Sequence, residues 1–87
     1  MTASTLAALA RELGYFVYRS LRWVNREEVP AMCAELMGVY AHGDVWREAI
    51  HQLGARRRLE LSGFARRQRL NLQRRELAEV LETQLRG

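Results

Sequence analysis

The chain has 87 residues, of which 48% are hydrophobic and 28% are charged, and its formal net charge is +4. This balance is typical of a globular protein and excludes a disordered chain, and the length allows one domain at most. No uncharged run approaches the ~20 apolar residues of a membrane-spanning helix. The N-terminus lacks the basic start of a signal peptide, and a single cysteine excludes an internal disulfide. We therefore expect one soluble, cytoplasmic domain over residues 1–87, with no membrane partner.

The first predicted element is a helix that starts close to the N-terminus. Apolar residues recur there at steps of three and four, which places them on one helix face: Leu6, Ala10, Leu13, Val17, Leu21 and Val24. Thr2, Ser4 and Thr5 are candidate N-cap residues. The opposite face is not purely polar, because aromatic side chains such as Phe16 alternate there with arginines. This helix therefore carries more apolar surface than one core-facing stripe requires.

A second helix is predicted after the sequence NREEV. Asn25 is a suitable N-cap, and Glu28 stands three residues later, as a capping box requires. Pro30 suits the first turn of a helix. The segment that follows, residues 31–41, contains Glu35 as its only charged residue. A helix that is apolar most of the way round is either central in its fold or pressed against a partner.

The sequence HGD at residues 42–44 predicts the boundary between the second and third helices. Gly43 suits a left-handed C-cap of the second helix, and Asp44 suits the N-cap of the third. The third helix has one apolar face, made of Val45, Trp46, Ala49, Ile50 and Leu53. Gly54 is a weak point or a stop for this helix.

The last third of the chain has a helical pattern with an internal break. As one continuous helix, residues 56–86 carry two apolar stripes on nearly opposite sides, which requires a break or two separate contacts. Ser62 is suited to cap a final helix that runs from about residue 64 to 85. Within it, Arg75 and Glu79 are spaced as an i,i+4 charge pair. Because no segment reads as a strand, the predicted fold is all-α: a small bundle of about four helices with short loops, which dimerisation is one way to complete.

Positive charge is concentrated in this last third. Residues 1–53 carry five arginines and six acidic residues, whereas residues 54–87 carry nine arginines and four acidic residues. Clustered arginines suit the phosphates of nucleic acid, whose binding is electrostatic and sensitive to salt. The candidate phosphate-binding residues are Arg56, Arg57, Arg58, Arg66, Arg67, Arg69, Arg74 and Arg75.

Two other interpretations of the arginine-rich segment remain open. A helix-turn-helix template fits poorly, because Arg69 stands where glycine is common and Arg75 where a buried aliphatic residue is expected. If a recognition helix does exist, Asn71 and Gln73 are its candidate base contacts. The purely structural alternative is that the arginines flank a leucine stripe, with buried stems and solvated heads.

Aromatic and methionine side chains on the first three helices indicate a protein interface, because these residue types are favoured in interface cores. The candidates are Tyr15, Tyr18, Trp23, Met32, Met37 and Trp46. The alternative is that they fill the core of the domain itself. We favour a homodimer or hetero-oligomer formed through the first two helices.

No catalytic, metal or cofactor signature is present in the sequence. Cys33 lies among apolar residues, so we expect a buried and inert thiol. It forms a spaced trio with His42 and His51, but zinc sites require paired ligands at short spacing. Glu27 and Glu28 are explained by the dipole of a helix N-terminus rather than by acid–base catalysis. We expect no enzyme activity, no metal and no cofactor.

The sequence-based hypothesis is a small, non-enzymatic protein that binds DNA or RNA through its arginine-rich last third. The rival hypothesis is a helical adaptor or chaperone-like subunit. Its apolar helices bind a protein partner, and its arginines meet an acidic surface on that partner.

Overall fold

The computed structural model describes residues 2–55 and 73–87. Within these ranges the chain forms four α-helices: α1 (Ala3–Leu21), α2 (Val29–Val39), α3 (Gly43–Ala55) and α6 (Arg74–Arg86). A 3₁₀ turn, Arg26–Glu28, precedes α2. The described residues contain no strand, so the all-helical class expected from the sequence is confirmed for them.

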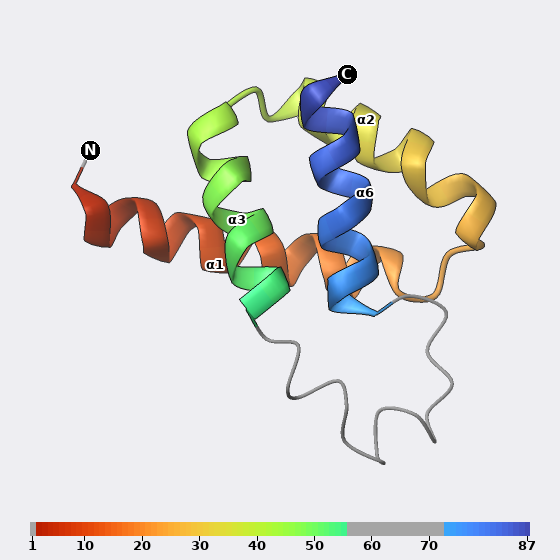
Figure 1. Cartoon of the computed structure of the whole chain (residues 1–87), viewed down its shortest axis with the longest axis horizontal. Coiled ribbons are helices and arrows are strands. Elements are labelled where there is room, and N and C mark those ends of the chain that lie inside the picture. Colours follow the sequence, from red (N-terminus) through yellow and green to blue (C-terminus); the bar gives the residue numbers. More distant parts are fainter. Residues whose placement is uncertain (1, 56–72) are drawn as a thin grey trace, which may run out of the picture.

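The helices are arranged around α3, which packs against both α1 and α6. Figure 1 shows α3 and α6 side by side, running in opposite directions and crossing the longer α1. Helix α2 packs against α6 and the 3₁₀ turn, at the edge of the assembly. As a result, the C-terminal end of α3 and the N-terminal end of α6 lie at the same end of the fold.

The sequence of α1 explains both its start and the face that it buries. The hydroxyl of Thr2 accepts a hydrogen bond from the backbone N–H of Thr5 at 3.2 Å, which caps the helix. The stripe expected from the spacing is confirmed, because Ala10, Val17 and Leu21 are buried. Gly14 lies on the same face where α1 meets α3, and a Cβ atom there would stand 3.5 Å from Leu53 Cγ.

The core forms where the apolar faces of the helices meet. Trp46 of α3 is only 1% exposed, and its indole N–H donates a hydrogen bond to the carbonyl of Tyr40 at 2.6 Å. The single polar atom of the ring is therefore paired inside the core. Leu77 and Leu81 of α6 are completely buried. Burial of one leucine side chain contributes roughly 1.5–3 kcal/mol, so these two residues hold α6 on the core.

Helix α2 is peripheral, although its sequence is apolar on nearly every side. It buries Val29 and Cys33, whereas Met32 and Val39 remain 37% and 83% exposed. Pro30 lies in the first turn, as expected. The sequence predicted that this helix is either central in the fold or pressed against a partner. The central position is wrong, because α2 packs mainly against α6 and the 3₁₀ turn.

The capping box predicted at the start of the second helix does not form. Asn25 makes no capping hydrogen bond with its side chain. The backbone N–H of Glu28 donates to the carbonyl of Asn25 at 2.9 Å instead, and this bond closes the 3₁₀ turn. The turn replaces the first turn of an α-helix, so α2 begins only at Val29.

The boundary between α2 and α3 also differs from the sequence-based prediction. Helix α2 ends at Val39, and Gly43 is the first residue of α3 rather than the C-cap of α2. Asp44 lies inside the first turn of α3, where its Oδ1 accepts from the N–H of Val45 at 2.9 Å. Gly54 does not stop α3, which continues to Ala55.

The final helix begins later than predicted. Gln73 has an extended backbone, with φ −94° and ψ 155°, so no single helix spans the last third of the chain. The first turn of α6 has no side-chain cap, and tertiary contacts stabilise it instead. The guanidinium of Arg26 donates to both carboxylate oxygens of Glu76, at 2.5 and 3.1 Å. The predicted cap at Ser62 lies outside the described residues.

Candidate functional site

The structure describes two of the eight candidate phosphate-binding arginines. Arg74 and Arg75 form the start of α6, at the end of the fold where α3 finishes. The other six lie outside the described residues: Arg56, Arg57, Arg58, Arg66, Arg67 and Arg69. The candidate base contact Asn71 also lies outside them, and Gln73 is the exposed N-cap residue of α6.

Arg74 packs on an aromatic ring of α1. Its guanidinium carbon lies 4.5 Å from the centroid of the Tyr18 ring, and the tyrosine itself is only 4% exposed. A guanidinium over an aromatic face is attracted by the ring quadrupole. Arg74 therefore has a structural contact between α6 and α1, whatever else it binds.

Arg75 is the more accessible of the two arginines. Its side chain is 58% exposed, and its Nε lies 3.7 Å from Glu79 Oε1. This contact confirms the i,i+4 pair that the sequence predicts. An exposed pair of this kind contributes only a few tenths of a kcal/mol, so it holds the guanidinium weakly and leaves it at the surface.

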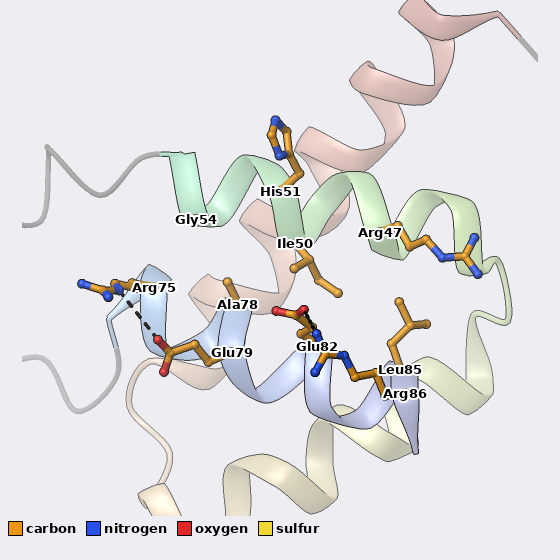
Figure 2. A pocket seen from close by; sticks show the side chains of 10 residues that line it. All are labelled: Arg47, Ile50, His51, Gly54, Arg75, Ala78, Glu79, Glu82, Leu85 and Arg86. Atoms are coloured by element: carbon orange, nitrogen blue, oxygen red, sulfur yellow. Dashed lines mark hydrogen bonds and ion pairs between the residues drawn. The ribbon is translucent and has the colours of Figure 1, made fainter.

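A groove of about 850 Å³ runs between α3 and α6. Figure 2 shows Ile50 of α3 and Leu85 of α6 pointing toward the facing helix, which gives the groove an apolar floor. Two ion pairs follow one another along α6: Arg75 with Glu79, and Arg86 with Glu82 at 2.5 Å. Sequence reasoning missed this groove, because its two walls come from segments that only the tertiary structure brings together.

The candidate interface residues fall into a surface group and a core group. Tyr15 and Trp23 are each 58% exposed, and Met32 is 37% exposed. Tyr18 and Trp46 belong to the core of the chain itself, at 4% and 1% exposure. Their assignment to an interface is therefore corrected: Trp46 belongs to the apolar face of α3, and Tyr18 lies beside the buried stripe of α1. Met37 is half-buried against the same core.

Phe16 joins the exposed group, although it was not among the candidate interface residues. It is 58% exposed and follows Tyr15 on α1, whereas Trp23 lies in the turn after this helix. Arg22 accompanies this set, with its guanidinium carbon 5.2 Å from the Trp23 ring centroid. We call Tyr15, Phe16 and Trp23 the aromatic face. The signal for Phe16 was its position opposite the buried stripe.

The groups that could have bound a metal are not gathered into one site. Cys33 is buried, and the loss of solvent around it raises the pKa of its thiol to about 11. His42 and His51 are both exposed. Within residues 2–55 and 73–87, no three side chains of His, Cys, Asp or Glu come together as metal ligands.

A helix that crosses a membrane needs about 20 predominantly apolar residues. None of the helices in the described ranges is both long enough and apolar enough to cross a bilayer.

The charges of the chain are segregated between the described helices and the segment that joins α3 to α6. Residues 2–55 carry five arginines and six acidic residues, and residues 73–87 carry three of each. Residues 56–72 carry six arginines and one acidic residue. The described residues thus have a net charge of −1, and the joining segment has a net charge of +5.

Comparisons of the chain with protein-family models, with curated proteins and with solved structures found no match.

Proposed function

We propose that this chain is a non-enzymatic binding protein of the cytoplasm and that its partner is DNA or RNA. The segregation of charge supports this proposal: the entire positive excess of the protein lies in residues 56–72. That segment starts at the end of α3 and finishes at the start of α6, which lie at the same end of the fold. Arg75 adds an accessible guanidinium there. Several arginines close together in sequence suit a run of phosphates.

The proposal assigns phosphate contacts to Arg56, Arg57, Arg58, Arg66, Arg67 and Arg69, with Arg74 and Arg75 next to them. Backbone phosphates carry no sequence information by themselves. We therefore expect affinity for nucleic acid in general. If a recognition helix exists, Asn71 and Gln73 are its candidate base contacts.

The test is binding of the purified protein to fluorescent duplex DNA, single-stranded DNA and RNA over a series of salt concentrations. We expect the logarithm of the binding constant to fall linearly with the logarithm of salt concentration. On duplex DNA the magnitude of this slope is about 0.9 for each phosphate that the protein neutralises. Arg66→Glu with Arg67→Glu should lower the affinity at least about tenfold and reduce the slope by about 2.

A control variant with the same change in total charge separates local contacts from net charge. Arg11→Glu with Arg47→Glu also lowers the net charge from +4 to 0. Both side chains are exposed, and neither forms an ion pair with another described residue. We expect this control to keep most of the affinity. No binding at low salt, or equal losses in the two double variants, would refute the proposal.

A protein partner is the second candidate, favoured by the apolar side chains that the fold leaves uncovered. The aromatic face and Met32 and Val39 of α2 are all exposed. In this case the arginines meet an acidic protein surface, and the nucleic-acid experiment gives no binding at any salt concentration.

A further inference from the structure

The outer side of α1 carries a symmetric pattern of side chains. Successive residues of an α-helix are rotated by about 100°, so a residue's angular position follows from its number. The line directly opposite the buried stripe passes between Glu12 and Arg19, both exposed. Tyr15 and Phe16 stand on either side of this line at its middle. Helix α1 ends at Leu21, so the exposed Trp23 lies in the turn beyond it and outside this pattern.

This pattern is complementary to itself when the helix direction is reversed. The positions pair about the point midway between residues 15 and 16, so that residue 12 pairs with residue 19. This pair joins an acid with a base. An interface with twofold symmetry requires such self-complementarity, because each surface meets a copy of itself.

We propose that two copies of this chain dimerise through α1, packed antiparallel with the twofold axis between Tyr15 and Phe16. In this arrangement Glu12 of each copy lies beside Arg19 of the second copy, each about 5 Å from the axis along the helix. The rings of Tyr15 and Phe16 from both copies gather at the axis.

The charged pair at the centre of this face supports a second copy over an unrelated partner. Neither Glu12 nor Arg19 forms an ion pair or a hydrogen bond with another described residue. The antiparallel dimer gives both groups a partner at two symmetric positions. The side chains of Tyr15 and Phe16, each 58% exposed in one chain, lose water at the same interface.

The first measurement is the molar mass in solution over a range of protein concentrations, by sedimentation equilibrium without nucleic acid. We expect a dimer that becomes a monomer on dilution, and a monomer at all concentrations for Phe16→Glu. Because Phe16 lies at the surface, this variant should keep its helical circular dichroism. The measurement involves no nucleic acid, so its outcome is independent of the phosphate-binding proposal.

Charge exchange tests the antiparallel register. Arg19→Glu alone places like charges side by side twice in the dimer, and so does Glu12→Arg alone. Each should raise the dimer dissociation constant about tenfold or more. The double variant Glu12→Arg, Arg19→Glu restores opposite charges and should return the dissociation constant to within about threefold of the original. Arg11→Glu is the matched control, since it lies on α1 away from the line and should leave the dimer unchanged.

Each of the possible results decides the proposal. A monomer at every concentration, or a dimer that survives Phe16→Glu, overturns the α1 interface. Loss of the dimer in both single charge variants without recovery in the double variant overturns the antiparallel register. Equal weakening by Arg19→Glu and Arg11→Glu shows an effect of total charge and overturns the assigned ion pair.

Discussion

The burial of a single residue in this protein, and the effect of replacing it, depend on the atoms within a few ångströms of it. Gly14 lies in the middle of α1, where glycine lowers helix stability, and Leu53 of α3 packs directly against it. Cys33 lies on a helix that leaves Met32 and Val39 exposed, yet it is itself completely buried. In both cases the neighbouring helix, rather than the residue type, sets the outcome of a substitution.

Substitutions of Gly14 should raise or lower the stability of the protein according to the size of the new side chain. A Cβ atom 3.5 Å from Leu53 Cγ is in ordinary contact, so Gly14→Ala should stabilise the protein by about 0.5–1 kcal/mol through helix propensity. Gly14→Leu has no room for its further carbons and should destabilise by roughly 1–3 kcal/mol. Urea denaturation measures both changes. Gly38→Ala is the control, because no atom lies within 4 Å of its Cβ position. Stabilisation by Gly14→Leu would contradict the close approach of α1 and α3.

Ionisation of Cys33 should make the protein less stable at alkaline pH. Burial raises the pKa of its thiol from 9.0 to about 11 in the folded state. Between these values the unfolded chain loses the proton and the folded chain keeps it. The stabilisation is therefore complete below pH 9 and is lost as the pH rises toward 11. The free energy of unfolding should fall by about 1–2 kcal/mol more between pH 8 and pH 10.5 than it does in Cys33→Ala.

Thiol chemistry provides an independent check on Cys33. The folded protein should react with a thiol-specific disulfide reagent at pH 8 much more slowly than the urea-unfolded protein does, because the reactive form is the exposed thiolate. Rapid, stoichiometric reaction of the folded protein would show that the side chain is accessible.

At the scale of the helices, the start of an element depends on contacts made by its first turn. Helix α6 begins at Arg74 without a side-chain capping hydrogen bond. Two contacts with distant parts of the chain hold this turn: Arg74 over the ring of Tyr18, and Glu76 with Arg26. Glu76 also lies where the helix dipole favours a negative charge.

The Arg26–Glu76 pair should make a small but measurable contribution to stability. It joins the 3₁₀ turn to α6 through two hydrogen bonds, and its side chains are 62% and 33% exposed. Exposed pairs contribute up to about 1 kcal/mol, and we expect a coupling of about 0.5–1 kcal/mol. A double-mutant cycle of Arg26→Gln and Glu76→Gln isolates this coupling energy. The dipole effect of Glu76 cancels in the cycle, because the single and the double variant that carry Glu76→Gln both lose it. Additive effects of the two substitutions would show that the pair contributes nothing.

The two proposals for the whole molecule involve different parts of the sequence, so they can be tested independently. The phosphate-binding proposal depends on residues 56–72 and on the first turn of α6, whereas the dimer proposal depends on the outer side of α1. Loss of nucleic-acid binding with an intact dimer affects only the first proposal. A monomer that still binds nucleic acid affects only the second.

The sequence by itself determined the helical class and the buried stripe of α1. Periodicity is a local property, so the spacing of Ala10, Val17 and Leu21 was enough to identify a face. The burial of Cys33 was also foreseen, because the residues directly before and after it, Met32 and Ala34, are apolar.

Only the tertiary structure decided which aromatic residues are core and which are surface, and where three of the helices begin. Tyr18 and Trp46 are buried, whereas Tyr15, Phe16 and Trp23 are not, although all five suit an interface by type. Periodicity shows that a helix has an apolar side, but the burial of each side chain depends on which helix packs there. A short helix likewise begins where distant residues stabilise its first turn, and no local pattern encodes those contacts.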